Sequence, residues 1–295
     1  CQIKILNDGS GIRISQKNGE WDEKQTENHE NSKSRRKTIM IHFVGAGSGA
    51  PDLITVRGQK FLREADVVIY AGSLVNPELL KETKPGCEIL NSAYMTLDEV
   101  IESMEKAESE GKMTVRLHTG DPAIYGAIRE QMDRLDEKKI AYDVCPGVSS
   151  FCGAASSLHA ELTLPGVSQS VIITRMAGRT GVPERESFRS LAAHHATMAV
   201  FLSTGLLSQM EQELAEVGYE PDTPAVIIYK ATWPEEKIVR CTVSTLAKSA
   251  EENGIKKTAM IFIGDVFGTR EANGYGESRL YAPDFSTEFR KGTDI

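Results

Sequence analysis

The chain has 295 residues, 40% of them hydrophobic, which is enough for one large or two ordinary domains with a real core. Its net charge is −8, and outside residues 1–38 there are 26 Lys and Arg against 36 Asp and Glu. An acidic body is a poor nucleic-acid binder, because phosphate contacts need a basic face, and no apolar run approaches the ~20 residues of a membrane-spanning helix.

Residues 1–38 are polar and charged and end in a basic patch at 33–37. Such a composition cannot bury enough apolar surface to fold alone, so we predict a flexible extension. We expect the patch to be solvated; the alternative is a non-enzymatic binding module whose basic tail recruits a partner. We expect no signal peptide. The chain begins with Cys1 instead of Met, so we also expect a trimmed or incomplete N-terminus.

The five cysteines include no CxxC pair and have no spacing typical of a metal site. They predict free thiols in a reducing, cytoplasmic environment. His194 and His195 end a predicted helix, where a cationic side chain suits the helix dipole, so we expect no metal there.

The folded body is predicted to start near Thr38 with an apolar strand over 39–44. A helix over 53–64 and a strand over 67–70 follow it. Together these three elements predict a β-α-β unit, with a glycine-rich loop after the first strand.

That loop contains Gly45-x-Gly47-x-x-Ala50, the spacing of a dinucleotide fingerprint. The fingerprint also needs an acidic residue after the second strand to bind a ribose, and 70–73 contains none. Pro51 interrupts the position where the helix should already be running. An NAD-binding oxidoreductase is therefore an alternative of a different class, and not the first hypothesis.

The stretch 115–126 is the most informative part of the sequence. Alternating apolar and polar residues predict a strand over 115–118, and Gly120 permits a tight turn after it. Asp121 is predicted to cap a helix whose first residue is Pro122. Ligands bind at the carboxyl ends of strands in an open α/β sheet, so we expect a ligand at this turn. The predicted helix carries Ile124, Ile128, Met132 and Leu135 at helical spacing.

We predict a strand over 141–145, followed by a turn over 146–150 and then by a helix of small residues. Because small side chains leave the helix backbone accessible, another helix, a strand or a ligand could pack closely against it. Near Pro165 the pattern resets, and strands then alternate with helices until an antiparallel pair appears late. This predicts a second α/β domain with a mixed sheet. The strands are expected at 170–175, 198–203, 225–229, 237–242 and 259–263, and the helices at 183–194, 206–217 and 244–253.

The predicted organisation therefore has four parts. A flexible extension covers 1–38, and an N-terminal α/β domain covers 39–165. A C-terminal α/β domain covers 166–267, and a polar tail covers 268–295.

The loop 118–122, His-Thr-Gly-Asp-Pro, resembles the Gly-Asp-Pro loop of the tetrapyrrole methylases, which depend on S-adenosylmethionine (SAM). With Tyr-Gly-Ala at 125–127 it looks most like the members that methylate carbon 11 of precorrin-4 or cobalt-precorrin-4 in cobalamin synthesis. Val-Gly-Ala-Gly at 44–47 and Pro-Asp-Leu-Ile-Thr at 51–55 are similar to the opening signature of the family.

Three further segments carry the resemblance. Pro-Gly-Val-Ser-Ser at 146–150 resembles a second SAM-contacting turn of the family. Met-Ala-Gly-Arg-Thr at 176–180 and Lys-Ala-Thr-Trp-Pro at 230–234 look like pieces of the carbon-11 enzymes. The resemblance covers about residues 39–265.

The resemblance implies two α/β domains with the active site in the trough between them, SAM as the cofactor, a tetrapyrrole as the substrate, and a homodimer. The implied SAM contacts are Thr119, Gly120, Asp121, Ile124, Tyr125, Ser149, Ser150, Met176 and Ala231. The implied substrate contacts are Gly47, Pro51, Asp52, Arg116, Arg179 and Lys230.

Methyl transfer from SAM makes few demands on side chains, because the sulfonium has a good leaving group and the precorrin carbon is an electron-rich nucleophile. Holding the two in line can supply about 7–11 kcal/mol, so we expect backbone contacts and apolar walls. After methylation the ring has to lose a proton or rearrange, and His118, Asp52 and Asp121 are the candidates to assist. A core role for His118, and a helix-capping role for Asp121, are the alternatives.

The substrate bears many carboxylates, so an acidic protein must concentrate cations locally to hold it. The candidate cations are Arg57, Arg116, Arg129, Arg175, Arg179 and Lys230. Any cobalt would arrive inside the substrate and needs no protein ligand.

Within the class of SAM-dependent tetrapyrrole methylases, methylation of another carbon of a precorrin or of uroporphyrinogen is the alternative.

Overall fold

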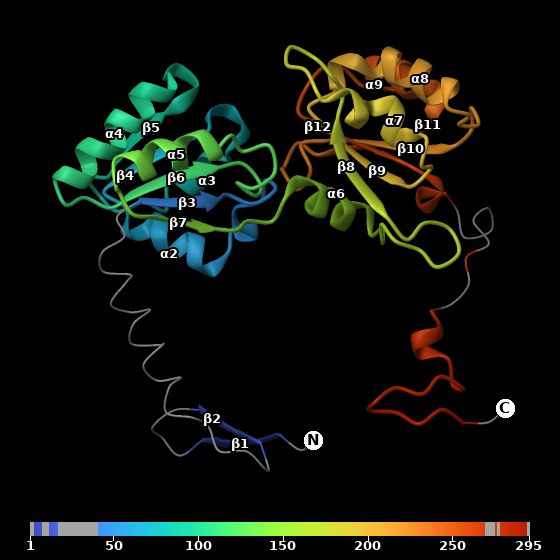
Figure 1. The fold of residues 1–295 in the computed structure, drawn as a ribbon, viewed down its shortest axis with the longest axis horizontal. Coiled ribbons are helices and arrows are strands. Elements are labelled where there is room, and N and C mark those ends of the chain that lie inside the picture. The colour runs from blue at the N-terminus through green and yellow to red at the C-terminus, as the bar shows by residue number, and fades with distance from the viewer. Residues whose placement is uncertain (1–2, 8–11, 17–40, 269–274, 276–277, 294–295) are drawn as a thin grey trace.

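Two five-stranded sheets, one from each half of the sequence, form the body of the described chain (Figure 1). The computed structural model describes residues 3–7, 12–16, 41–268, 275 and 278–293. Helices cover both faces of each sheet, so the predicted α/β architecture with two sheets is confirmed.

The first sheet is entirely parallel, in the order β5-β4-β6-β3-β7. Its central strands β3 and β6 are buried at every residue, as expected for parallel strands covered on both faces. Because all five strands run the same way, their carboxyl ends lie along one edge. The strands are β3 (Ile41–Gly45), β4 (Val67–Tyr70), β5 (Glu88–Asn91), β6 (Thr114–His118) and β7 (Tyr142–Cys145).

The helices of the first domain divide between the two faces of this sheet. On one face, Leu62 and Leu79 bring α2 (Val56–Glu64) and α3 (Pro77–Leu80) against the sheet. On the other face lie α4 (Leu97–Ser109) and α5 (Arg129–Glu137). Three short 3-10 turns, η1 (Pro51–Leu53), η2 (Gly72–Leu74) and η3 (Ser92–Tyr94), follow strand ends.

The helix predicted to start at Pro122 begins only at Arg129, so that prediction was wrong, together with the helix-capping role of Asp121. The reason lies in the backbone between them. Tyr125 has φ +55° and Ala127 has φ +49°, and a right-handed helix cannot run through left-handed residues. The segment is a turn, in which one carboxylate oxygen of Asp121 accepts a hydrogen bond from the Ala123 amide at 2.8 Å.

The second sheet is mixed, as predicted, in the order β11-β10-β12-β9-β8. β8 and β9 are parallel, whereas β12 pairs antiparallel with β9 and with β10, and β11 pairs antiparallel with β10. Its strands are β8 (Val171–Arg175), β9 (Thr197–Phe201), β10 (Pro224–Tyr229), β11 (Lys237–Thr242) and β12 (Ala259–Ile263).

Three helices cover one face of the second sheet and one helix covers the other (Figure 1). The helix predicted over 183–194 is divided into η4 (Glu184–Glu186) and α7, because the Ser187 hydroxyl caps a new helix start by accepting from the Ser190 amide. The helices are α7 (Phe188–Ala192), α8 (Leu207–Glu216) and α9 (Leu246–Glu252) on one face and α6 (Ser150–Leu158) on the other, with short turns at η5 (Thr204–Leu206), η6 (Val243–Thr245) and η7 (Asp265–Phe267).

α6 is the helix of small residues, and it packs against the second sheet although it precedes Pro165 in sequence. Ala154 and Leu158 share a core with Val226 and Phe262 of the second sheet. A domain boundary at 165 stays a prediction; the packing groups α6 with the sheet that follows it.

The two ends of the chain are described only in part. β1 (Ile3–Asn7) and β2 (Ile12–Gln16) form an antiparallel pair, while the rest of the predicted extension, including 33–37, lies outside the described residues. Near the other end, η8 (Arg279–Tyr281) belongs to a short segment in which the Arg290 guanidinium donates to several backbone carbonyls. In the described part of the chain, no helix combines the length and the apolar character that spanning a bilayer requires.

Candidate active site

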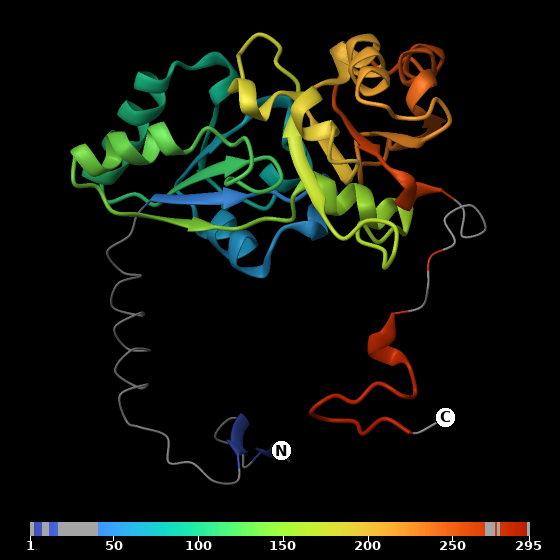
Figure 2. The ribbon, with the colours of Figure 1, turned by 45° about the vertical axis from the view of Figure 1, so that its right-hand side comes forward.

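The two sheets face each other through the carboxyl ends of several of their strands, namely β3 and β6 of the first sheet and β8, β9 and β10 of the second. The strands of the first sheet point toward the second domain in both views (Figure 1, Figure 2). In the second sheet β8, β9 and β10 run in the same direction, because β12 is antiparallel to both β9 and β10. We call the loops after these strands, with the loop after β7, the facing loops: 46–50, 119–128, 146–149, 176–183, 202–203 and 230–236.

Direct contacts join the facing loops of the two domains. The Thr232 hydroxyl lies 3.1 Å from the Ser48 hydroxyl and accepts a hydrogen bond from the Ala50 amide at 3.0 Å. The ring of Tyr125 lies 5.3 Å from the ring of Phe201, measured between centroids. These contacts bring the first-domain loops that the sequence singled out against the ends of β9 and β10.

Within the first domain, glycines allow three loops to touch through their backbones. Gly47 and Gly120 exchange two amide-carbonyl hydrogen bonds, at 2.9 and 3.3 Å. A Cβ on Gly45 would come within 2.6 Å of the Gly147 backbone, so both positions require glycine. The Asp121 carboxylate accepts from the Gly147 amide at 2.9 Å and so ties the loop after β6 to the loop after β7.

Gly120 faces the start of α6. A Cβ built on it would lie 3.4 Å from the Ser150 amide nitrogen and 3.5 Å from the Ser149 Cα. The structure therefore brings together Gly47, Gly120, Asp121, Ser149 and Ser150, five of the residues that the sequence predicts for the site.

The same geometry counts against the NAD alternative. A dinucleotide loop opens directly into a helix, whose N-terminus holds the pyrophosphate. Here α2 begins only at Val56, capped by the Thr55 hydroxyl, which accepts from the Gly58 amide at 3.1 Å. The amide and the carbonyl of Gly47 are both engaged with Gly120.

Both carboxylate oxygens of Asp121 accept hydrogen bonds from backbone amides and so stabilise the local loops. One accepts from the Ala123 amide and the other from the Gly147 amide, at 2.8 and 2.9 Å. The carboxylate thus closes its own turn and positions the turn beside it. Asp52, in η1, is by contrast exposed to solvent.

His118 is 3% exposed and stacks against Phe43 at a centroid distance of 6.0 Å. Burial, and next the charge of Arg116, lower the pKa of His118 from 6.5 to about 3. An efficient general base has a pKa near the working pH, so a neutral His118 is poorly matched to that task. Its Nε2 has no hydrogen-bond partner among the described residues, and the same is true of the Thr119 hydroxyl next to it.

Arg116 is not available to the substrate as a free cation at the facing loops. Its side chain is buried, and its guanidinium donates to the Gln131 side chain at 3.0 Å and to the Ile69 carbonyl at 3.1 Å. Burial lowers the pKa of Arg116 to about 10. Gln131 in turn donates to the Ala127 carbonyl at 2.9 Å, so Arg116 supports the loop 119–128 from inside the domain.

In the second domain, Met176 is buried at the end of β8, and its amide donates to the Ser203 hydroxyl at 2.9 Å. Arg175 folds the loop after it by donating to the Met176, Thr180 and Gly181 carbonyls. Ala231 is buried at the end of β10, which is separated from β8 by the two strands β12 and β9.

Lys230 lies where the two domains meet. Its ammonium group is 4.9 Å from the centroid of the Trp233 ring and 3.5 Å from the Glu235 carboxylate. The Trp233 ring packs on Gly49, where a Cβ would collide with it.

The other candidate cations differ in how free they are. Arg57 and Arg179 are exposed, whereas Arg129 pairs with Asp133 on α5 at 2.7 Å. Arg175 is engaged with three carbonyls, as described above. Exposed Arg179 and Arg57 remain as cations that a bound carboxylate could approach, and so does Lys230, whose contact with Glu235 is longer, at 3.5 Å, than the 2.7 Å pair of Arg129.

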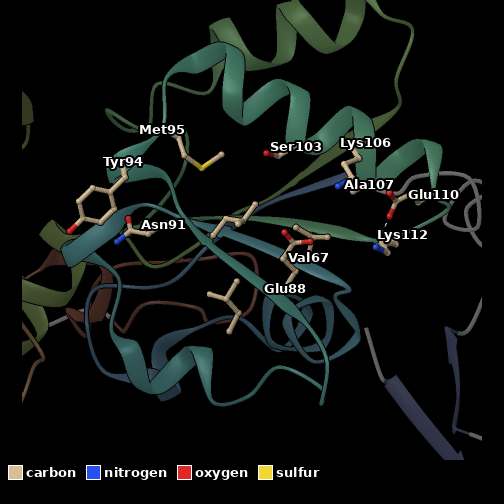
Figure 3. Close-up of a pocket in the computed structure, with 12 residues that line it drawn as sticks. Val67, Glu88, Asn91, Tyr94, Met95, Ser103, Lys106, Ala107, Glu110 and Lys112 are labelled. Carbon is tan, nitrogen blue, oxygen red and sulfur yellow. Dashed lines mark ion pairs between the residues drawn. The ribbon is translucent and has the colours of Figure 1, made fainter.

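A cavity of about 440 Å³ lies elsewhere, between the edge strand β5 and α4 (Figure 3). Its polar side chains include the ion pair of Glu110 and Lys112, together with Lys106, Ser103 and Asn91. None of the predicted site residues lines it, so it is not the predicted site. Within the described chain, no group of three or more His, Cys, Asp or Glu residues could hold a metal ion.

Sequence reasoning missed the turn at Leu202 and Ser203. The sequence predicted a strand over 198–203, but β9 ends at Phe201 and Leu202 has φ +52°. Ser203 and Gly205 are residue types typical of turns, and they could have signalled the end of this strand. Thr232, which joins the domains, was marked only as part of a resembling segment.

Two α/β domains thus meet through the carboxyl ends of their strands, where ligands commonly bind in α/β proteins, and glycine-rich loops are hydrogen-bonded to one another there. The chain belongs to the tetrapyrrole (corrin/porphyrin) methylases, whose family model matches residues 40–247.

Particular relatives cover almost the whole body. The chain is 51% identical over 258 residues to a cobalt-precorrin-4 C(11)-methyltransferase of Methanocaldococcus jannaschii, covering 88% of this chain and 97% of that protein. A solved cobalt-precorrin-4 methyltransferase is 49% identical, with a TM-score of 0.76 over 78% of this chain and 96% of its own. A uroporphyrin-III C-methyltransferase of Thermus thermophilus, solved with S-adenosyl homocysteine, is 26% identical, with a TM-score of 0.63 over 77% of this chain and 93% of its own.

Proposed function

We propose that this chain is a SAM-dependent methyltransferase that methylates carbon 11 of cobalt-precorrin-4, or of precorrin-4, in cobalamin biosynthesis. The observation that carries the proposal is the 51% identity, over nearly the full length, to a relative named for that reaction. The related uroporphyrin-III enzyme solved with the demethylated cofactor supports SAM as the methyl donor.

The facing loops fit such a cofactor. The Thr119 hydroxyl is buried without a partner in the described chain, so it is available to a polar group of a ligand. The side of Gly120 where a Cβ would stand faces the backbone of Ser149 and Ser150 at 3.4–3.9 Å, so the loop after β6 lies directly against the start of α6. The residues proposed to hold SAM are Thr119, Gly120, Ile124, Tyr125, Ser149, Ser150, Met176 and Ala231, with Asp121 fixing the turn that carries the first of them.

SAM supplies a methyl group on a sulfonium cation with a good leaving group. The chain's own contribution is alignment, for which a rigid set of loops is suited, and about 7–11 kcal/mol is available from it. The Gly47–Gly120 bonds and the Asp121–Gly147 bond provide that rigidity. Of the three carboxyl and imidazole candidates, exposed Asp52 is the one we retain to take up a proton, because burial makes His118 a weak base with a pKa of about 3 and because Asp121 is engaged.

The substrate carboxylates are assigned to Lys230, Arg179 and Arg57, with Gly47 and Pro51 bordering the ring. Lys230 is held beside Trp233, between the domains, and the two arginines are exposed. Arg116 is left out of this set because it is buried and bonded within the first domain.

Titration calorimetry with S-adenosyl homocysteine tests the cofactor, and we expect saturable one-site binding. Incubation with SAM and cobalt-precorrin-4, followed by mass spectrometry and NMR, tests the position of methylation. Transfer to another carbon, or to uroporphyrinogen only, would assign the chain to a sister activity. Absence of binding at high micromolar concentration would overturn the proposal.

A homodimer and a cytoplasmic location complete the proposal. Light scattering coupled to size-exclusion chromatography tests the first, with twice the chain mass of 32.4 kDa expected. Fractionation of cells that express the protein tests the second, with the protein expected in the cytoplasmic fraction.

A further inference from the structure

Glu236 is a partly buried residue at the end of the facing loop 230–236, and its carboxylate accepts two short hydrogen bonds. Its Oε2 atom lies 2.6 Å from the Ser157 hydroxyl, which donates from α6, and 2.5 Å from the Thr232 amide, which donates from the same loop. Hydrogen bonds to a carboxylate are shorter and about twice as strong as those between neutral groups. Glu236 therefore ties Thr232 to α6.

The backbone of Thr232 needs such a restraint. Its φ is +67°, and this left-handed conformation is a genuine outlier for a β-branched residue. Strain of this kind persists only where the surroundings enforce it, and it is common at functional sites. The bond from the Thr232 amide to Glu236 is one contact that enforces it.

In this conformation the Thr232 hydroxyl faces the other domain. It accepts a hydrogen bond from the Ala50 amide at 3.0 Å and lies 3.1 Å from the hydroxyl of buried Ser48. Helix α6 packs against the same place, since a Cβ on Gly153 would come within 2.4 Å of the Ser48 side chain and 3.2 Å of the Thr232 methyl group. The loops 46–50 and 230–236 therefore meet on the surface of α6.

The two loops carry residues that the proposed function assigns to different ligands. Gly47 lies in the loop 46–50 and Pro51 directly follows it, and both are assigned to the substrate. Ala231, assigned to SAM, directly precedes Thr232. The contact between the loops thus sets how the methyl donor meets its acceptor. A misplacement of about 1 Å can cost about a hundredfold in rate where catalysis depends on alignment.

We propose that Glu236 is a positioning residue for methyl transfer. Through Thr232 it holds the loop 46–50 against the loop 230–236, and so it aligns the substrate with SAM without touching either. This inference rests on the proposed function.

The test compares three variants of the full chain in single turnovers at saturating SAM and cobalt-precorrin-4. Glu236→Ala removes the acceptor, and we expect methyl transfer to slow by about tenfold to a hundredfold, with the affinity for S-adenosyl homocysteine within about threefold of the wild type. Glu236→Gln keeps an oxygen that can accept both hydrogen bonds, so its rate should stay within about threefold of the wild type.

Glu211→Ala is the matched control. Glu211 is also partly buried and also accepts from a backbone amide, that of Ala247, at 2.8 Å, but it lies on α8, outside the facing loops. The variant should lose a bond of the same kind and keep the wild-type rate of methyl transfer.

A double variant shows whether Glu236 acts through Thr232. Thr232→Val removes the acceptor of the Ala50 amide, so we expect it to slow methyl transfer by a factor similar to that of Glu236→Ala. If both residues act in one chain of contacts, the double variant should be at most about threefold slower than Thr232→Val, whereas independent effects would multiply.

Amide hydrogen exchange gives a readout that needs no turnover. The Ala50 amide is bonded to the Thr232 hydroxyl, so its exchange reports whether the loop 46–50 is held. We expect this exchange to become at least about tenfold faster in Glu236→Ala, and to stay at the wild-type rate in Glu236→Gln and Glu211→Ala. If Glu236→Ala does not fold, Ser157→Ala replaces it, with an expected change of about fivefold.

Three results would each overturn the proposal: unchanged exchange at Ala50 in folded Glu236→Ala, an unchanged rate of methyl transfer in that variant, or losses that multiply in the double variant. If the wild-type chain does not methylate a tetrapyrrole, it is the proposed function that fails, and the exchange data still show whether Glu236 holds the loop 46–50.

Discussion

Replacing Gly120 by Val places a branched side chain where the loops after β3, β6 and β7 meet. Gly120 has φ +62°, so the substitution costs about 1–2 kcal/mol in backbone strain. The space itself tolerates the first carbon, since the nearest atom to a Cβ, the Ser150 amide nitrogen, lies at 3.4 Å. The protein should therefore fold, with a melting temperature lower by about 2–8 °C. The added methyl groups would occupy the side of Gly120 that the proposal gives to SAM.

The assay is titration calorimetry with S-adenosyl homocysteine, and we expect its affinity to fall by at least about tenfold, or 1.4 kcal/mol. Gly111→Val is the matched control. Gly111 has φ +67°, nothing lies within 4 Å of its Cβ position, and it follows α4, away from the facing loops. It should lose similar stability and keep the affinity for S-adenosyl homocysteine. Wild-type affinity in folded Gly120→Val would refute the reasoning and remove this loop from the cofactor site.

Three more predictions follow from single contacts. Gln131→Met deprives buried Arg116 of an acceptor and should lower the free energy of unfolding by about 1–3 kcal/mol in urea titrations; an unchanged midpoint would mean that water replaces the amide. Thr232→Val removes the contacts to the Ser48 hydroxyl and the neighbouring loop and should cost about 1–3 kcal/mol, whereas Thr232→Ser should restore most of it. The stability should fall as the pH drops from about 6.5 to about 3, because the unfolded chain binds a proton at His118 that the folded protein excludes. His118→Phe should reduce that slope by up to about 1.4 kcal/mol per pH unit, and an equal slope in both proteins would contradict the lowered pKa.

Elements set by local pattern could be predicted from the sequence. The strands over 67–70 and 259–263 were predicted at the residues where β4 and β12 lie, because short apolar runs bounded by turn residues leave little choice. The mixed second sheet followed from the order of its elements. The error after Pro122 has a different origin, since Tyr125 and Ala127 adopt a left-handed backbone that their residue types do not favour, and the ring of Tyr125 packs on Phe201 of the other domain.

The candidate site shows the same division. Gly47 and Gly120 were predicted from the motif, and the structure brings them into contact through their amides and carbonyls. Arg116 was assigned to the substrate as a basic residue near the motif, but strand periodicity alone did not reveal that its side chain turns inward. The left-handed turn at Leu202 was not predicted, because the neighbouring Ser203 is held by a hydrogen bond from the Met176 amide in the loop after β8, 27 residues away in the sequence.

The attachment of α6 to the second sheet determines how the two halves of the protein can move. Within the described chain, the path from one sheet to the other passes through 146–149, after β7 and before α6. A rigid-body opening of the halves must therefore bend at that short connection and carry α6 along with the second sheet. Ser149 sits in this pivot and Ser150 moves with the helix, while Gly120 stays behind. A ligand that contacts both Gly120 and Ser150 would therefore bridge the two sides of this connection and would hold the two halves together.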